Sequence, residues 1–299
     1  MELRVLRYFL AVANEGSVSR AAASLHVTQP TLSRQLMDLE DELGTRLFRR
    51  SSRSTSLTES GVYFRRRAEE IVALADAAQA EFRTQEGLIA GDVFIGGGET
   101  PAFSLLAAAA QQVQTEHPGV RFHLYSGNGN DVAERLERGV LDFALFIDPV
   151  DVSRYEYLTL PARDTWGVLM RADAPLASEP CITPQQLAPL PLLLSSQSQI
   201  DALFSAWLGQ DVTKLNIVAR GNLLYNISVL VQQGLGYAVT LAGILNTADS
   251  GLVFRPLSPA LTAGIHVAWL KSRPLSRAAQ CWLATLRTAV AGQGLHKQV

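Results

Sequence analysis

Three short helical patterns follow one another within the first 43 residues, and their spacing permits only a compact helical bundle at the amino terminus. In the first pattern apolar residues recur every three or four positions, which places them on one face of a helix that Gly16 ends. That face consists of Leu3, Leu6, Phe9, Leu10 and Ala13. We therefore expect this helix to bury one side against the two helices that follow.

The second and third patterns each begin with a hydroxyl residue that is able to cap a helix. Ser17 precedes an alanine-rich stretch, and Thr28 precedes a stretch with Pro30 in its first turn, where the missing N–H costs little. The inward positions of these two helices are Val18, Ala21, Ala22 and Leu25, then Leu32, Leu36, Leu39 and Leu43. Because the alanines permit close approach of another helix, we expect one three-helix bundle.

The outer face of the third helix indicates a function. Its amino-terminal end presents side chains that hydrogen-bond to base edges or phosphates, namely Gln29, Thr31, Ser33, Arg34 and Gln35. Its acids are confined to the carboxyl-terminal half, at Asp38, Glu40, Asp41 and Glu42. An ordinary solvated face, which is the alternative, would carry several Glu and Lys along its whole length. We therefore interpret this helix as one that reads the major groove of DNA.

Residues 46–58 combine two short extended runs with a turn rich in serine and arginine. Residues 1–67 hold eleven arginines and seven acids, a net charge of +4, whereas the rest of the chain carries −6. The planar fork of arginine suits phosphate and guanine contacts, and a basic hairpin can follow the DNA backbone or enter the minor groove. Charge alone would equally fit a solvated basic face. Next to a recognition helix, it indicates a basic wing.

This part of the chain resembles the LysR-type transcriptional regulators. The resemblance rests on residues 9–61, in particular SVSRAAASLHVTQPTLSRQLMDLEDELGTRLFRR followed by SLTESG. It implies a winged helix-turn-helix in which residues 29–31 and 33–35 approach the groove and three arginines lie in the wing. With the helix caps included, the predicted DNA-binding residues are Ser17, Thr28, Gln29, Pro30, Thr31, Ser33, Arg34, Gln35, Arg49, Arg50 and Arg53.

One long helix is expected from Thr58 to about Gly87, because this stretch lacks proline, has no interior glycine after Gly61 and is rich in Ala, Glu and Arg. A seam with heptad spacing runs through Ile71, Ala75, Ala78, Phe82, Gln85 and Ile89. Such a seam predicts a homodimer, with packing on its own domain as the alternative. A dimer would set two recognition helices roughly 34 Å apart on a near-palindromic operator in double-stranded DNA. The resemblance adds that such dimers pair into homotetramers.

Beyond Gly91, strand patterns alternate with helical patterns, which predicts parallel sheets in a two-lobed α/β domain. This half resembles the LysR-type sensor domain, which is similar in fold to periplasmic binding proteins, through HPGVRFHLYSG, LERGVLDFALF and VLVQQGLGYAVTL. One departure falls at Thr240 and Leu241, where the family usually has an apolar residue and proline. The resemblance therefore predicts the fold here but not the structure of the local loop.

The expected organisation has three parts. They are a winged helix-turn-helix at 1–58, a linker and dimerisation helix at 59–90 and an effector-binding domain at 91–299. Within the last part, lobe I covers about 91–161 and 265–299, and lobe II covers about 162–264, with crossovers near 161–163 and 263–265.

Ligands of open α/β sheets bind beyond the carboxyl ends of the strands, and this rule selects the loops of the second half. The predicted effector-binding residues are Glu99, Thr100, Pro101, Ser126, Asn128, Asp148, Ser195, Ser196, Asn222 and Thr240. A hydroxyl at a helix start, as at Thr100, favours an anion, whereas Glu99 and Asp148 favour an amine or a hydroxylated ligand. Any of these residues could instead serve only as a turn or a cap.

Composition and motifs disfavour other classes of protein. With 47% hydrophobic and 18% charged residues the chain should fold throughout, and it shows neither a membrane span nor a signal peptide, so we expect a cytoplasmic protein. Cys181 and Cys281 are too few for a disulfide framework or a thiolate zinc site, which leaves a redox switch as a minor alternative.

The motifs of common enzymes are missing from the sequence. The glycines at 96–98 lack the Lys-Ser/Thr of a phosphate-binding loop, the five histidines show no metal spacing, and no serine lies in a G-x-S-x-G turn. A transport-type binding protein could share the second half but would not need residues 1–90. We therefore expect no catalysis, no cofactor and no metal, and interpret the chain as a DNA-binding regulator whose operator affinity depends on a small-molecule effector.

Overall fold

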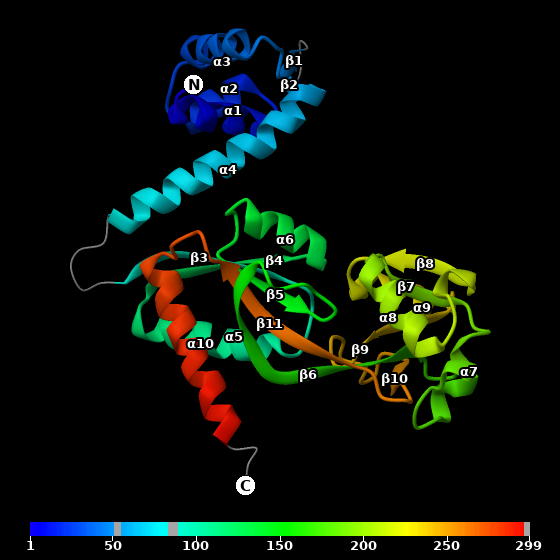
Figure 1. Ribbon diagram of the computed structural model, residues 1–299. Helices are drawn as coiled ribbons and strands as arrows, with labels where there is room; N and C mark the ends of the chain where they lie inside the picture. The colour runs from blue at the N-terminus through cyan, green and yellow to red at the C-terminus, as the bar shows by residue number, and fades with distance from the viewer. Residues whose placement is uncertain (51–54, 83–88, 296–299) are drawn as a thin grey trace. The chain divides into compact units, whose positions relative to one another are not determined.

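The computed structural model of the chain describes residues 1–50, 55–82 and 89–295. It divides into two compact units, Met1–Arg83 and Thr84–Val299, and each unit is described here by itself (Figure 1). The first unit is helical with a small hairpin, and the second combines helices with an extended sheet.

Three capped helices build the core of the first unit. They are α1 (Leu3–Glu15), α2 (Val18–Ser24) and α3 (Gln29–Leu43). Ser17 caps α2 by accepting a hydrogen bond from the N–H of Arg20, and Thr28 caps α3 by accepting one from the N–H of Thr31, as predicted. Gly16 ends α1 in the left-handed conformation, with φ of 60°.

The buried face of α1 differs from the expected one. The fully buried positions of α1 are Val5, Leu6, Phe9 and Val12, whereas Leu10 and Ala13 are only half-buried. In α3, Leu32, Leu36 and Leu39 are buried as expected, but Leu43 is 38% exposed. Because Phe9 is the large side chain at the centre of the bundle, in contact with the rings of Phe48 and Phe64, it decides which side of α1 faces inward.

A hairpin and a long helix complete the first unit. Strands β1 (Phe48–Arg50) and β2 (Thr55–Leu57) pair in antiparallel fashion and are followed by α4 (Glu59–Phe82). Ala68 of α4 is completely buried in the bundle core, and Phe64 and Val72 pack against that core. The amino-terminal half of α4 is therefore part of this unit, which matches the alternative of packing on its own domain.

The second unit consists of two lobes. In lobe I, β3 (Ala90–Gly97) pairs in parallel with β4 (Gly119–Ser126) on one side and β5 (Phe143–Ile147) on the other. Helices α5 (Phe103–Glu116) and α10 (Arg277–Leu295) cover one face of this sheet, and α6 (Gly129–Glu137) covers the other (Figure 1). Ile89 packs against the core of lobe I, so its predicted place in a dimer seam on α4 is wrong.

Lobe II repeats this arrangement around β7 (Leu192–Ser195), with β8 (Ile217–Gly221) and β9 (Tyr237–Leu241) parallel to it. Helix α9 (Leu224–Gln232) covers one face of that sheet. The other face is covered by α7 (Pro184–Leu187), α8 (Ser198–Leu208) and the 3₁₀ turns η1 (Pro175–Ser178) and η2 (Val212–Lys214). Strand β10 (Leu252–Pro256) pairs with an edge of the sheet, and it was not predicted.

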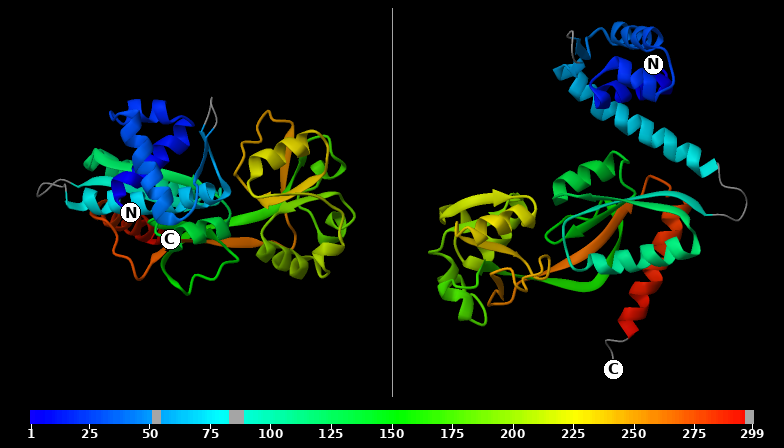
Figure 2. Two further views of the ribbon diagram at one scale, coloured as in Figure 1. Left: turned by 90° about the horizontal axis from the view of Figure 1, so that it is seen from above. Right: turned by 180° about the vertical axis from the view of Figure 1, so that it is seen from behind.

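Two long antiparallel strands connect the lobes. β6 (Tyr155–Arg171) and β11 (Thr262–Leu270) lie side by side and run from one lobe into the other (Figures 1 and 2). Their pairing passes through Arg163 and Gly264, the two regions predicted as crossovers. The predicted fold class, a helix-turn-helix joined to a two-lobed α/β domain, is confirmed, and β6 is one continuous strand that belongs to both lobes.

Candidate functional site

The predicted groove-reading side chains lie at the exposed start of α3. Gln29, Pro30, Thr31 and Arg34 are exposed, and Ser33 and Gln35 are half-buried. Thr28 and Thr31 hydrogen-bond to each other through their hydroxyls at 2.8 Å. Arg34 forms no hydrogen bond or ion pair with any described residue, so its donors are free for an external partner.

The predicted wing is the β1–β2 hairpin. Arg49 is exposed and lies opposite Ser56, and the backbone of Arg50 pairs with that of Thr55. Arg53 lies outside the described residues. The hairpin thus places at least one arginine of the predicted set on an exposed strand that follows closely after α3.

A buried carboxylate fixes the hairpin to the recognition helix. Glu40 of α3 is 3% exposed, and its Oε1 accepts hydrogen bonds from the backbone N–H groups of Leu47 at 2.8 Å and Phe48 at 3.0 Å. Its Oε2 accepts one from the Arg46 guanidinium at 2.8 Å. Burial raises the pKa of Glu40, but the bonds from Arg46, Phe48 and Leu47 outweigh burial and the pKa is lowered.

Glu40 was expected among the outer acids of α3, so this role was not predicted from the sequence. A signal was present, because position 40 follows the buried Leu36 by four residues and therefore shares its inward face. A charged residue at an inward position implies a partner, which here comes from the following loop.

The turn into α4 makes a second close contact with the hairpin. The Thr58 hydroxyl donates to the carbonyl of Arg46 at 2.7 Å and accepts from the N–H of Gly61 at 2.9 Å. A Cβ atom at Gly61 would lie 2.0 Å from the carbonyl oxygen of Leu47. The L-T-x-x-G sequence therefore serves to seat α4 directly against β1.

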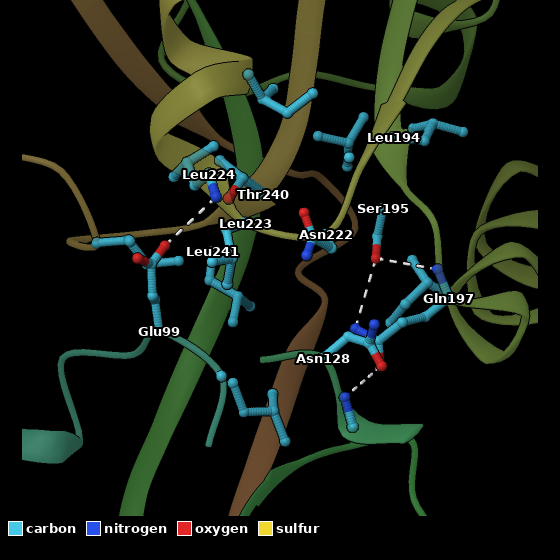
Figure 3. Close-up of a pocket in the computed structure, with 18 of the residues that line it drawn as sticks. Glu99, Asn128, Leu194, Ser195, Gln197, Asn222, Leu223, Leu224, Thr240 and Leu241 are labelled. Atoms are coloured by element: carbon cyan, nitrogen blue, oxygen red, sulfur yellow. Dashed lines mark hydrogen bonds between the residues drawn. The ribbon is translucent and has the colours of Figure 1, made fainter. Parts of the chain in front are cut away.

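A crevice lies between the two lobes of the second unit (Figure 3). Six of the predicted effector residues line it, namely Glu99, Asn128, Asp148, Ser195, Asn222 and Thr240. Its walls are mostly apolar and include Leu145, Ile147, Trp166, Leu193, Leu194, Ile200, Leu223, Leu224, Ile227, Val239, Leu241 and Ile244. Few polar groups in an apolar cleft are typical of small-molecule sites.

The other predicted effector residues lie outside this crevice. Thr100, Pro101 and Ser126 line a neighbouring cavity that shares Glu99 with the crevice. Ser196 lines neither cavity, and its backbone N–H donates to the carbonyl of Gly221 at 3.0 Å.

The Thr100 hydroxyl is already satisfied within the protein. It donates to Asp164 Oδ2 at 2.5 Å and accepts from the N–H of Ala102 at 3.0 Å, and both Thr100 and Asp164 are more than 90% buried. Burial raises the pKa of Asp164, and the bond from Thr100 only partly offsets this. The hydroxyl hydrogen that was expected to hold an anion is thus already engaged with Asp164.

Two hydrogen bonds cross the crevice in opposite directions (Figure 3). The N–H of Leu224, at the start of α9 in lobe II, donates to Glu99 Oε2 of lobe I at 3.3 Å. The N–H of Gly129, at the start of α6 in lobe I, donates to Gln197 Oε1 of lobe II at 3.1 Å. Asn128 also caps α6, since its Oδ1 accepts from the next N–H groups of that helix at 3.0 Å each. Each lobe therefore helps to cap a helix of the other.

Asp148 connects the crevice to the crossover strands. Its Oδ2 accepts from the N–H of Gly264 at 3.1 Å, and its Oδ1 lies 3.2 Å from His266 Nε2. The other ring nitrogen of His266 lies 3.1 Å from the Thr159 hydroxyl on β6. A ligand at Asp148 would therefore contact a residue that is hydrogen-bonded to β11 and is linked to β6 through His266.

The cysteines do not resemble a redox pair. Cys181 lies next to Ile182 in the core of lobe II, whereas Cys281 lies on α10 of lobe I, and both are free thiols. Burial, and to a lesser extent Glu116, raises the pKa of the Cys281 thiol, which disfavours the reactive thiolate.

Comparisons with known proteins agree with this architecture. Residues 3–62 match the family described as "Bacterial regulatory helix-turn-helix protein, lysR family", and residues 86–291 match "LysR substrate binding domain". The Hca operon transcriptional activator HcaR of Escherichia coli is 32% identical over 280 residues, covering 91% of this chain and 92% of HcaR. The regulator BudR of Raoultella terrigena is 30% identical over 278 residues, covering 90% of this chain and 94% of BudR.

Solved structures share the fold over the full length. Full-length CbnR complexed with its target DNA has a TM-score of 0.72 at 21% identity, covering 97% of this chain and 100% of CbnR. A cysteine-to-aspartate variant of full-length OxyR from Pseudomonas aeruginosa has a TM-score of 0.57 at 26% identity, covering 96% of this chain and 100% of OxyR.

The chain belongs to the LysR family of transcriptional regulators. Its first unit carries the DNA-binding helix-turn-helix of that family, and its second unit is the effector-binding domain. Within the described ranges, no helix has the length and hydropathy that a membrane crossing requires.

Proposed function

We propose that this regulator binds a near-palindromic operator through the exposed start of α3 and the β1–β2 hairpin. The observation that carries this proposal is that Arg34, which has no partner among the described residues, and Gln29 are both exposed on the amino-terminal half of α3, whose acids lie in its other half. Arginine and glutamine form bidentate hydrogen bonds to guanine and adenine in the major groove. CbnR, which shares this fold, has been solved with its target DNA.

Self-association belongs to the same proposal. On the carboxyl-terminal half of α4, Ile71 is 39% exposed, Leu74 is 42% exposed and Ala78 is exposed. Two further positions of the predicted seam, the Phe82 side chain and Gln85, lie outside what the structure describes. An exposed apolar stripe on a long helix favours pairing with a second copy, as a homodimer or a homotetramer, which would present two recognition helices to two half-sites.

Ligand binding in the crevice is the proposed means of regulating operator affinity. A small molecule that binds among Glu99, Asn222 and Thr240 contacts both lobes, so it would change the balance between open and closed arrangements. A ligand that binds one arrangement more tightly can shift operator affinity by at most that difference in binding free energy, if the two arrangements differ in their affinity for DNA. Because its relatives are named as transcriptional regulators, we propose that the chain acts by binding and carries out no catalysis.

The test is a titration of fluorescent operator DNA with the full chain, with and without added metabolites. Asn222→Ala removes a polar group from the crevice without touching α3. We expect this variant to bind operator DNA without ligand as the wild type does, but to lose the ligand response. A metabolite response that is unchanged by every crevice substitution would contradict the proposed control.

A further inference from the structure

We propose that the effector is an organic cation, an ammonium or a close relative carried on an apolar body. This inference rests on the proposed function of the crevice and specifies its ligand. The described charged side chains that line the crevice are all acidic. Glu99 and Asp148 line the crevice, and none of the described residues that line it is Lys, Arg or His. An anion placed there would meet two carboxylates and no side-chain cation.

Two basic side chains close in sequence or in contact with lining residues are already engaged within the protein. Arg220 donates to the carbonyl of Ser195 and to Asp201 Oδ1, both at 2.9 Å. His266 on β11 lies within hydrogen-bond distance of Asp148 and of Thr159 on β6. It is not among the residues that line the crevice. Neither side chain is therefore placed to neutralise an anionic ligand.

Three backbone donors at helix starts near the crevice are already occupied within the protein. The first N–H of α9 donates to Glu99, and Gly129 at the start of α6 donates to Gln197. At the start of α5, the Thr100 hydroxyl accepts from the N–H of Ala102. To bind these three N–H groups, a ligand carboxylate would have to displace the protein's own acceptors, and at α9 that acceptor is itself a carboxylate.

Glu99 can accept hydrogen bonds from a cationic ligand. Its Oε2 bond to Leu224 is long, at 3.3 Å, and its Oε1 has no hydrogen bond to any described residue. Figure 3 shows the side chain reaching across the crevice toward the start of α9. An ammonium group donates up to three hydrogen bonds and would satisfy the free oxygen without breaking the bond to Leu224.

The remaining lining suits the rest of such a ligand. Leu194, Trp166 and Leu241 present apolar surface to such a ligand. Asn222 and Thr240 add neutral polar groups. Because the carboxylate of lobe I caps a helix of lobe II, a cation held by that carboxylate would act on both lobes at once.

The experiment compares probes that share a body and differ in the head group. Benzylamine, benzoate and benzyl alcohol form one set, and butylamine, butyrate and 1-butanol form another. Each is titrated calorimetrically into the full chain at neutral pH. We expect the amine of at least one set to bind at least about tenfold more tightly than its carboxylate and its alcohol, with the preference weakening at high salt.

Variants identify the side chain that binds the charged group of the ligand. Glu99→Gln should reduce amine affinity about tenfold, the typical worth of one charge-assisted hydrogen bond, whereas Glu99→Asp should keep the preference for amines. The matched control is Glu179→Gln, which changes a carboxylate of lobe II that is half-buried like Glu99 but lines neither cavity, and it should leave amine affinity unchanged. Thermal melts verify that each variant is folded.

Three results would overturn the inference: carboxylates that bind as tightly as their amines in both sets, no amine binding in either set, or an amine preference that survives both Glu99→Gln and Asp148→Asn. Operator binding is measured on the same preparations. Site-specific DNA binding together with a crevice that prefers carboxylates would reject this inference alone. Loss of site-specific DNA binding in the wild type would instead reject the proposed function.

Discussion

The carboxylate of Glu99 in lobe I accepts a hydrogen bond from the backbone N–H of Leu224 in lobe II, at 3.3 Å. Its counterpart is Gln197 of lobe II, which accepts from the N–H of Gly129 in lobe I at 3.1 Å. Each residue caps the first turn of a helix in the opposite lobe. The two bonds therefore link the closure of the crevice to helix capping, and both fall within reach of a ligand.

Removing one of these bonds should loosen the crevice. Gln197→Ala leaves the N–H of Gly129 without its acceptor from lobe II, and a hydrogen bond of this kind contributes about 0.5–1.5 kcal/mol. We expect amide hydrogen exchange at Gly129 to accelerate roughly two- to tenfold. Gln199→Ala, at an exposed position in the first turn of α8, should leave that rate unchanged. Equal exchange rates in both variants would show that the bond does not hold the lobes together.

The buried pair Thr100 and Asp164 gives a prediction with a defined pH dependence. Because burial raises the pKa of Asp164, the fold disfavours its ionised form. Its contribution to stability is then largest below the unfolded pKa of about 3.9 and is lost as pH rises through the folded pKa.

Asp164→Asn keeps an acceptor for Thr100 but removes the buried charge, so we expect stability at pH 7 to be equal or higher. Asp164→Ala leaves the buried hydroxyl of Thr100 unpaired and should cost about 1–3 kcal/mol. Denaturant unfolding of both variants at pH 5 and pH 7 checks this. A large loss in Asp164→Asn at pH 7 would mean that the carboxylate charge itself is stabilising.

Glu40 should behave in the opposite way. Its pKa is lowered by Arg46 and two backbone N–H groups despite burial, so its contribution is present above the unfolded pKa of about 4.3 and is lost as pH falls through the folded pKa. Glu40→Gln should destabilise the first unit by about 1–3 kcal/mol at pH 7 and weaken operator binding through the hairpin. Asp41→Asn, its exposed neighbour, is the control. Thermal melts and operator titrations that match for the two variants would refute this role of Glu40.

Pairing through α4 can be tested with two equivalent substitutions. Ile71→Glu places a charge on the proposed seam, and Val62→Glu places one at a residue that is 53% exposed and lies on the opposite side of the helix. We expect Ile71→Glu alone to shift the chain toward monomers in analytical ultracentrifugation and to weaken operator binding. A wild-type chain that sediments as a monomer at micromolar concentration would contradict the dimer.

Local rules allowed much of this architecture to be predicted from the sequence. Ser17, Thr28 and Thr58 cap the helices that follow them because capping depends on three or four neighbouring residues. The alternation of strands and helices beyond residue 91 likewise depends on short-range periodicity. The same local reasoning brought six effector candidates to one crevice, because it identified the carboxyl ends of the parallel strands.

Features that depend on distant residues were beyond such rules. Thr100 and Asp164 are 64 positions apart, so their bond gave no local signal. The continuous strand β6 contains Pro161, which interrupts a strand pattern in sequence but is tolerated where the chain passes between lobes. Glu40 was assigned to solvent because its partners on the hairpin only become neighbours when the hairpin folds back onto α3.

The most direct test of the central claim is genome-wide mapping of the sites that the full chain binds, for the wild type and for a variant with Gln29→Ala and Arg34→Ala. Both side chains are exposed on α3 and are not needed for its core. We predict discrete near-palindromic sites for the wild type and their loss in the variant, with each lost bidentate contact worth about 1–3 kcal/mol. An absence of enriched sites for the wild type, or an unchanged set of sites for the variant, would contradict the account.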